Sequence, residues 1–283
     1  MFAADQYQLL DFGQGRKLER FGPYILDRPA PACSDAAPRL AECWADATAH
    51  YERSCGEQGV WLPPDALPDR WCVVHRQVTL ELRPTSFGHL GLFPEQAENW
   101  LWLANRVSRS SRALDVLHLF AYTGGSTLAC AASGARVVHV DAARNVVQWA
   151  RRNAALSGLA TASIRWLVED ATTFVARECR RGKSYDAVVL DPPSYGHGPR
   201  GESWQIDTDL LPLLTGCRQL VRDRESFGLL TCHSPGWGPD ELRRLLRRSR
   251  LISGSSEVQA GELHLTCSDG RRLSAGTFVR WSA

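Results

Sequence analysis

Residues 114–141 read LDVLHLFAYTGGSTLACAASGARVVHVD and specify the architecture of the chain. The apolar run 116–120 predicts a strand, Thr123-Gly124-Gly125 a turn, the small residues after it a helix, and the run ending in Asp141 a second strand. A strand–loop–helix–strand unit of this kind is typical of the first crossover in a sheet that binds a nucleoside or dinucleotide.

Asp141 is a candidate ligand for a ribose. It stands 16 positions after Gly125, at the predicted tip of the second strand, where a carboxylate can accept two hydrogen bonds from a ribose diol. The glycines let a ligand approach the backbone closely. A helix cap or a turn aspartate is the alternative interpretation. Because residues 121–126 lack the dinucleotide fingerprint G-x-G-x-x-G, NAD is disfavoured.

A second motif, DAVVLDPPSY at residues 186–195, ends an apolar strand in Asp191. Pro192 and Pro193 fix φ and remove two backbone donors, so the turn can only accept hydrogen bonds. Asp191 and the Pro192 carbonyl therefore suit an amino group or a ring N–H of a planar base, and Tyr195 is close enough in sequence to stack on it. A strand-ending turn with a capping aspartate is the alternative.

The segments HLFAYTGGSTLACAASGA, VVHVDAARNVVQWARRNAALSGL and DAVVLDPPSYG resemble class I S-adenosylmethionine-dependent methyltransferases of the ribosomal-RNA large-subunit type. The resemblance runs from about Thr85 to the end of the chain. It implies an α/β fold with a Rossmann-like seven-stranded sheet, S-adenosylmethionine as cofactor, and a cytosine or guanine base of ribosomal RNA as substrate.

The resemblance also implies most of the cofactor site. GLFPEQ at 91–96 is similar to the segment that the family places against the methionine end, and Asp170 matches an acidic residue that accepts the adenine amino group. A simple cap for a helix at 172–179 is the alternative for Asp170. The expected catalytic residues are Asp191, Pro192 and Tyr195. The expected cofactor-binding residues are Phe93, Gln96, Phe120, Tyr122, Thr123, Gly124, Gly125, Asp141, Ala142, Asp170 and Asp191.

Composition is that of an ordinary soluble globular protein. The 283 residues are 44% hydrophobic and 23% charged, with a net charge of +2. No signal peptide or membrane-spanning run is present, so we expect a cytosolic protein. The nine cysteines include no C-x-x-C pair and no histidine at ligand spacing, so no metal site is predicted.

Two domains are expected. Residues 1–84 predict a small α+β domain, with strands at 8–11, 17–21, 24–26 and 71–82 and a helix at 41–51. It suits substrate recognition, with dimerisation or a lid as alternatives. Residues 85–283 form the expected methyltransferase domain. Its further elements are a helix at 94–109 with Trp100 and Trp102 in the core or on a platform, a glycine-rich loop at 195–202, a basic helix at 241–250, and a hairpin of 262–267 and 273–281.

The methylated atom stays open between nitrogen and carbon. A nitrogen acceptor needs only Asp191 and the turn, whereas C5 of cytosine needs a thiolate that first adds to C6. Cys232 lies near a strand end, but related 5-methylcytosine enzymes appear to carry the thiol where this chain has Ser234. The main prediction is methylation of a base in ribosomal RNA. The alternatives are a small-molecule or protein nitrogen as acceptor, and a non-catalytic RNA-binding scaffold.

Overall fold

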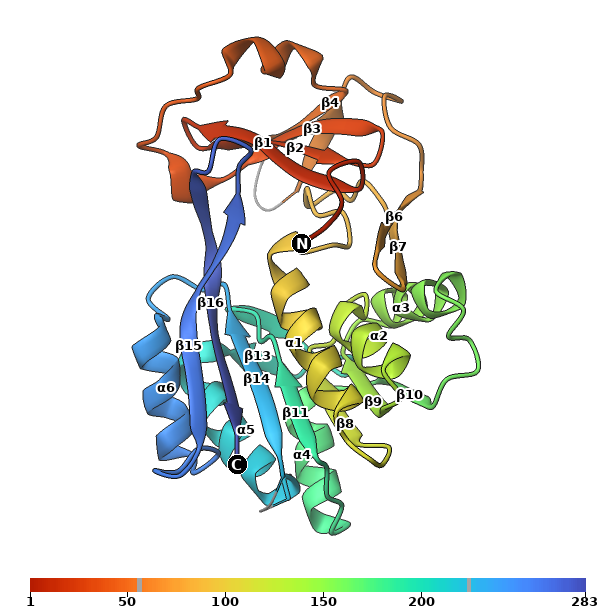
Figure 1. Cartoon of the computed structure of the whole chain (residues 1–283), viewed down its shortest axis with the longest axis vertical. Coiled ribbons are helices and arrows are strands. Elements are labelled where there is room, and N and C mark those ends of the chain that lie inside the picture. The colour runs from red at the N-terminus through yellow and green to blue at the C-terminus, as the bar shows by residue number, and fades with distance from the viewer. Residues whose placement is uncertain (55–57, 223–224) are drawn as a thin grey trace. The chain divides into compact units, whose positions relative to one another are not determined.

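The computed structural model describes residues 1–54, 58–222 and 225–283 (Figure 1). The chain divides into two compact units. The first comprises residues 1–98 and 264–275, and the second comprises residues 99–263 and 276–283. The predicted α/β class with a seven-stranded sheet and a separate N-terminal sheet is confirmed.

The first unit is built on a five-stranded sheet. Its strands follow in chain order: β1 (Tyr7–Gly13), β2 (Arg16–Phe21), β3 (Tyr24–Pro29), β4 (Ala49–Arg53) and β5 (Gly59–Leu62). The first three form the predicted antiparallel meander, because Gly15 (φ 75°) and Gly22 (φ 61°) allow the two tight turns. Leu9, Phe12 and Leu265 belong to its core.

The helix predicted at 41–51 is wrong. The structure has a 3₁₀ helix, η2 (Ala41–Asp46), followed by β4. The Thr48 N–H donates to the Ile25 carbonyl at 2.7 Å, and the Thr48 hydroxyl accepts the Ile25 N–H at 3.1 Å. Tyr51 is fully buried on β4. β-branched and aromatic residues prefer such a half-buried sheet position, and pairing with β3 decides against the helix.

The single strand predicted at 71–82 is also wrong. It is a hairpin of β6 (Trp71–His75) and β7 (Val78–Leu82), in which His75 pairs with Val78. Arg76 takes the turn with φ 55°. The usual sequence signal for such a turn is glycine or asparagine at positive φ, and this chain has Arg76-Gln77 instead.

The second unit contains the seven-stranded sheet, in the order β10-β9-β8-β11-β14-β16-β15. The parallel strands are β8 (Asp115–Leu119), β9 (Arg136–Asp141), β10 (Ile164–Val168), β11 (Ala187–Leu190) and β14 (Phe227–Cys232). β16 (Arg272–Ser282) runs antiparallel beside β14, next to β15 (Glu257–Thr266). These last two strands form the predicted hairpin, longer than expected.

Helices cover both faces of this sheet (Figure 1). The helices are α1 (Ala97–Ser108), α2 (Gly125–Ala132), α3 (Arg144–Leu156), α4 (Ala171–Arg180), α5 (Ile206–Leu220) and α6 (Pro239–Arg248). Leu103 of α1 and Cys130 of α2 pack on one face with Val116 and Leu229. Phe174 of α4, Leu210 of α5 and Leu242 of α6 pack on the other with Leu117 and Leu230. Alternate strand residues thus supply two separate cores.

The order of the strands positions the site. From β8 the chain moves outward to β9 and β10, then returns to β11 on the other side of β8. Leu119 pairs with both Val140 and Leu190, so the carboxyl ends of β8, β9 and β11 lie level at one edge of the sheet. Ligands of open α/β sheets bind outside this edge, where the strand order reverses.

The glycine-rich loop predicted at 195–202 needs one correction. Two short strands, β12 (Tyr195–His197) and β13 (Ser203–Gln205), pair there antiparallel. Trp204 fixes the pairing because its ring is buried and its Nε1 donates to the Pro193 carbonyl at 2.7 Å. Only the turn between the strands keeps loop character.

Candidate active site

The loop after β8 holds an unusual backbone conformation. Phe120 (φ 53°), Tyr122 (φ 48°) and Gly124 (φ 91°) are all left-handed, and two of the three carry side chains. Each non-glycine residue in this region costs roughly 1 kcal/mol or more. The Ala121 N–H holds the loop by donating to the Val140 carbonyl at 3.1 Å. Strain of this kind accompanies functional loops, so this loop is a candidate for ligand contact.

The two glycines of the turn serve different purposes. Gly124 precedes α2 in a conformation that favours glycine. Gly125 has a packing role, because a Cβ there would lie 2.5 Å from the buried ring of Trp100. Trp100 is therefore a core residue. From the sequence, both glycines were expected to admit a ligand. At Gly125, packing against Trp100 is sufficient to explain the need for glycine.

Asp141 is held rigidly at the end of β9. Its Oδ2 accepts the N–H of Tyr122 at 2.8 Å and its Oδ1 accepts the N–H of Ala143 at 2.9 Å. Burial raises the pKa of the carboxyl, although both hydrogen bonds oppose the rise. Each carboxylate oxygen has a second lone pair. The side chain is partly exposed and therefore has two acceptor positions for a diol at this edge.

Asp170 caps α4. Its Oδ1 accepts the N–H of Thr173 at 2.7 Å, and the residue is largely buried at the end of β10. The cap considered as an alternative is thus present. It uses one carboxylate oxygen, which leaves the second as an acceptor for an amino group. The adenine contact stays a prediction.

Asp191 follows β11 and lies beside His233. His233 Nε2 is 3.4 Å from Asp191 Oδ1. Burial by itself raises the pKa of Asp191, but the charge of His233 and hydrogen bonds from His233 and Thr231 outweigh it and keep the pKa below its usual value. Asp191 is therefore a carboxylate at neutral pH, able to accept an N–H from a substrate.

Three buried polar side chains near this edge of the sheet contact one another, and the sequence analysis did not identify them. Thr127 Oγ1 lies 2.7 Å from His118 Nδ1 and 2.9 Å from His139 Nδ1. His118 pairs with His139 and with Val189, two residues before Asp191, so all these side chains share one face. Burial lowers the pKa of His118 to about 4, so this imidazole is neutral. The available signal was a histidine inside each of two apolar strands.

The Asp-Pro-Pro turn is fixed from two sides. Trp204 donates to the Pro193 carbonyl and packs on Phe120, with ring centroids 4.8 Å apart. Ser194 Oγ lies 2.6 Å from Ser234 Oγ, which ties the turn to the segment after β14. Tyr195 is 56% exposed and its hydroxyl contacts His197. The ring is accessible for stacking, as its predicted role requires.

Cys232 is unsuited to act as a nucleophile. It is 1% exposed at the end of β14, and burial raises the pKa of its thiol. A buried neutral thiol is inert. Ser234, two positions later, is engaged by Ser194. Eight described cysteines are free, and Cys55 lies outside the described residues.

The remaining predicted cofactor residues divide between the units. Thr123 and Ala142 flank the edge described above, and the Thr123 carbonyl accepts Asn153 Nδ2 at 2.9 Å. Phe93 and Gln96 belong to the first unit, where Phe93 precedes η3 (Pro94–Gln96) and Gln96 is buried. Their contact with the cofactor stays a prediction.

Comparison with known proteins places the chain in a family. A family model described as S-adenosylmethionine-dependent methyltransferase matches residues 43–250. The chain belongs to this family. It is therefore a transferase with S-adenosylmethionine as cofactor, as the sequence predicted. The donor set fits that cofactor, since Asp141 and Asp170 end adjacent strands beside the strained loop.

Two curated relatives are both named Ribosomal RNA large subunit methyltransferase K/L. The one from Shewanella frigidimarina is 30% identical over 128 residues, which are 43% of this chain and 18% of that protein. The one from Alteromonas mediterranea is 31% identical over 121 residues, 42% of this chain and 17% of that protein. The chain thus spans less than a fifth of the length of these relatives.

Two solved structures are similar to nearly the whole chain, a longer part than the curated relatives match. The SAM Dependent Methyltransferase from Agrobacterium tumefaciens is 37% identical with a TM-score of 0.93, covering 100% of this chain and 92% of that one. SMU.776, a putative methyltransferase complexed with SAH, is 16% identical with a TM-score of 0.76, covering 99% of this chain and 76% of that one. At 16% identity the similarity concerns the fold alone.

Membrane-spanning helices and metal-ligand clusters are both absent from the part of the chain that the structure describes. No helix in residues 1–54, 58–222 and 225–283 is both long and apolar enough to cross a membrane. Within the same ranges, no three His, Cys, Asp or Glu residues are grouped so that they could hold a metal ion.

Proposed function

We propose that the protein methylates a nitrogen of a base in ribosomal RNA. The observation that carries the proposal is Asp191, a carboxylate kept ionised at the switch point of the sheet and followed by a rigid turn that can only accept hydrogen bonds. The relatives named Ribosomal RNA large subunit methyltransferase K/L support RNA as the substrate.

The residues of the chain have distinct tasks in this proposal. S-adenosylmethionine supplies a methyl group already activated on a positively charged sulfur. Asp141 and Asp170 accept hydrogen bonds from the ribose and the adenine, with Phe93 and Gln96 at the methionine end. Asp191 and the Pro192 carbonyl accept the hydrogens of the acceptor amine and align its nitrogen, while Tyr195 stacks on the base.

The proton that the nitrogen loses also needs an acceptor. His118 is buried, whereas His233 touches Asp191 and its side chain is 32% exposed. Asp191 and His233 together can therefore pass the proton to water. A carbon acceptor is disfavoured because the thiol of Cys232 is buried and protonated at neutral pH.

The first unit has a proposed role of its own. Residues 1–84 would contact RNA and residues 85–283 would carry out transfer. Deleting the first unit is a poor test, because residues 264–275 of the hairpin belong to it. Charge changes on exposed residues of β4 and β5, such as Arg53→Gln, are better suited.

The test is transfer of labelled methyl from S-adenosylmethionine to RNA from a host that lacks this gene. Protein and small-molecule fractions of the same lysate are assayed in parallel, with Asp191→Ala as the inactive control. Label in the large ribosomal RNA supports the proposal, and nucleoside analysis then identifies the atom. Label confined to another fraction contradicts the RNA substrate and favours a small-molecule or protein nitrogen.

A further inference from the structure

A cavity lies in the second unit, far along the strands from Asp191. It has a volume of about 310 Å³ and lies between α1 and the β15–β16 edge. Ser282 in its wall pairs with Phe227, the first residue of β14, whereas the candidate active site begins where the parallel strands end. We call it the α1–β16 groove. Its volume is at the lower limit of ligand pockets.

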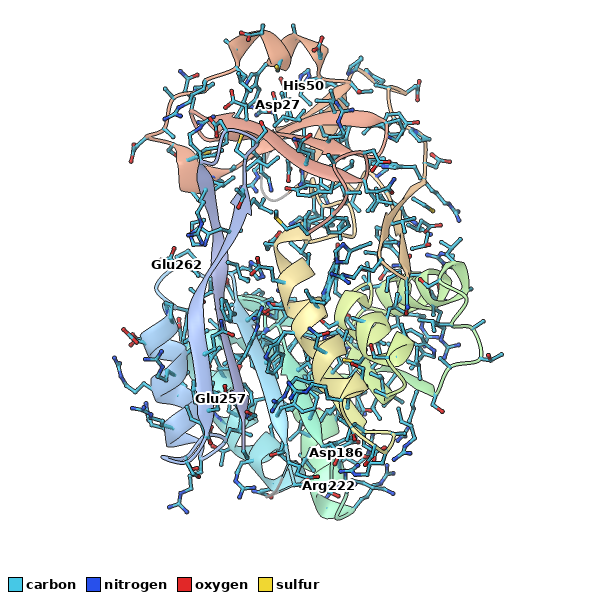
Figure 2. The ribbon with its side chains drawn as sticks, in the orientation of Figure 1. Asp27, His50, Asp186, Arg222, Glu257 and Glu262 are labelled. Carbon is cyan, nitrogen blue, oxygen red and sulfur yellow. The ribbon has the colours of Figure 1, made fainter. Side chains whose placement is uncertain are left out.

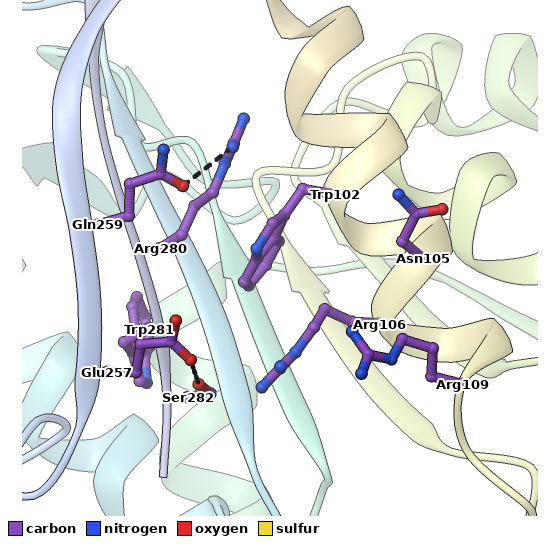
Figure 3. Close-up of a pocket in the computed structure, with 9 residues that line it drawn as sticks. All are labelled: Trp102, Asn105, Arg106, Arg109, Glu257, Gln259, Arg280, Trp281 and Ser282. Carbon is purple, nitrogen blue, oxygen red and sulfur yellow. Dashed lines mark hydrogen bonds between the residues drawn. The ribbon is translucent and has the colours of Figure 1, made fainter.

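Arginines dominate the charge of this groove. Arg106 comes from α1, Arg109 directly follows the last residue of α1, and Arg280 comes from β16, against one carboxylate, Glu257 of β15. Three positive groups less one negative group give a net lining charge of +2. Figure 3 shows the Arg106 side chain extending from α1, and the Arg109 side chain from the residue after α1, toward the opposite wall, where Gln259 contacts Arg280 and Ser282 contacts Glu257.

The Arg106 side chain is positioned by aromatic rings. Arg106 lies over the rings of Trp102 and Phe227, with its guanidinium carbon 5.9 and 5.7 Å from their centroids. Within the described residues, neither Arg106 nor Arg109 forms an ion pair. Across the groove, Arg280 is 7% exposed and is anchored by Asn99 Oδ1 at 2.8 Å and Gln259 Oε1 at 3.3 Å.

The excess of positive charge in the groove favours binding of an anion. Arg106 lies in the last turn of α1 and Arg109 directly after its end, and like charges three residues apart around a helix end repel. The carboxyl end of α1 offsets only about half a charge. Guanidinium groups match the oxygens of a phosphate in a bidentate way. S-adenosylmethionine contains no phosphate, so the cofactor does not account for the groove.

We propose that the α1–β16 groove is a second binding site, which takes a phosphate group through Arg106 and Arg109, with Arg280 on the opposite wall. The phosphate comes either from the backbone of an RNA substrate or from a free phosphorylated molecule. A backbone phosphate would extend the RNA contact beyond the methylated base. This site does not depend on which atom is methylated.

Two probes test the groove and distinguish the sources. Inorganic pyrophosphate is titrated into the full chain by calorimetry, and binding of a structured ribosomal RNA fragment is measured by anisotropy over a range of salt. The test variant is Arg106→Gln/Arg109→Gln, with Arg109→Gln alone as a milder change. The matched control is Arg247→Gln/Arg248→Gln, which removes two exposed charges from the last turn of α6.

We expect the test variant to lose pyrophosphate binding, or to show a salt dependence of RNA binding that is less steep by about 1 to 2 in log K against log salt. The control variant should keep the wild-type pyrophosphate binding and the wild-type slope. Loss of pyrophosphate binding with an unchanged RNA slope identifies a free phosphorylated ligand. A less steep RNA slope identifies the RNA backbone as the source of the phosphate. If neither probe distinguishes the test variant from the wild type, the proposal is wrong, whatever the result of the methylation assay.

Discussion

Asp141 is the residue whose substitution most directly tests the cofactor site. Asp141→Ala removes two acceptor oxygens and also releases the N–H groups of Tyr122 and Ala143. Hydrogen bonds to a charged acceptor contribute about 1.5–3 kcal/mol, so we expect S-adenosylmethionine to bind about ten- to 150-fold more weakly. Calorimetric titration measures this. Wild-type affinity in the variant would refute the ribose assignment.

Asp191 should separate binding from transfer. Asp191→Ala removes the acceptor for the substrate N–H, while Asp141 and Asp170 are unchanged. We expect methyl transfer to fall below detection and the affinity for S-adenosylmethionine to change by less than about tenfold, a loss of less than about 1.4 kcal/mol. Activity is measured by label transfer and affinity by titration of the same preparation. Retained activity would exclude Asp191 from the transfer site.

Substitution of Cys232, unlike that of Asp191, should leave methyl transfer largely intact. Because burial raises the pKa of its thiol, it carries no negative charge at neutral pH. Cys232→Ala should therefore keep most of the methyl transfer activity, with a stability loss of about 1 kcal/mol from the small void. Loss of activity in a variant that still binds S-adenosylmethionine and unfolds cooperatively would restore the carbon mechanism.

These residues show how far the sequence predicted the site. Asp141 ends a strand, and Asp170 and Asp191 come just after one, so parallel pairing alone brings them to one edge. His118 could not be assigned in this way. It lies within β8, so its importance depends on which face of the sheet its side chain occupies, and a one-residue change of register would reverse that face. His233 directly follows β14, so the same reasoning places it at this edge, but the sequence does not indicate its contact with Asp191.

Among the elements, β14 has a close-packed contact that glycine alone permits. Gly228 pairs with Trp281 of β16, and a Cβ on Gly228 would lie 2.1 Å from the indole. Trp281 is 1% exposed and cannot move aside. We expect Gly228→Ala to lower the free energy of unfolding by about 1–3 kcal/mol, the usual cost of overpacking. Urea denaturation measures the change.

Two further variants control this experiment. Gly254→Ala adds the same methyl group where nothing lies within 4 Å, and should leave stability within about 1 kcal/mol of the wild type. Gly228→Ala/Trp281→Phe should regain part of the lost stability, because the smaller ring vacates the space. Additive losses in the double variant would show that the indole is not the cause.

The elements of the second unit were more predictable than those of the first. Long apolar strands alternate there with amphipathic helices, and β9 ends at Asp141, as predicted. In the first unit, β4 depends on pairing with β3, and the turn between β6 and β7 is made by Arg76 without glycine. Such features depend on tertiary contacts that local sequence patterns do not contain.

At the scale of the whole molecule, stability should depend on pH through Asp186. This residue is 1% exposed at the start of β11 and accepts two hydrogen bonds from Arg112, at 2.7 and 2.8 Å, and one from the Asp115 N–H at 2.8 Å. Arg222 pairs with the same carboxylate, and Figure 2 labels the two residues together. Burial raises the pKa of Asp186, but these donors outweigh it and hold the pKa well below the usual value.

The sign of the pH effect follows from this lowered pKa. Below an unfolded pKa of about 3.9, Asp186 binds a proton in the unfolded chain but not in the folded chain. The free energy of unfolding therefore decreases as the pH is lowered. Asp186→Asn should lose about 1.5–3 kcal/mol at pH 7, the contribution of a charged acceptor, and the gap to the wild type should narrow from pH 5 to pH 2. Urea denaturation across this range measures it, with exposed Asp35→Asn as the control. A gap that stays constant with pH would mean that packing, and not the charge of Asp186, stabilises this end of the sheet.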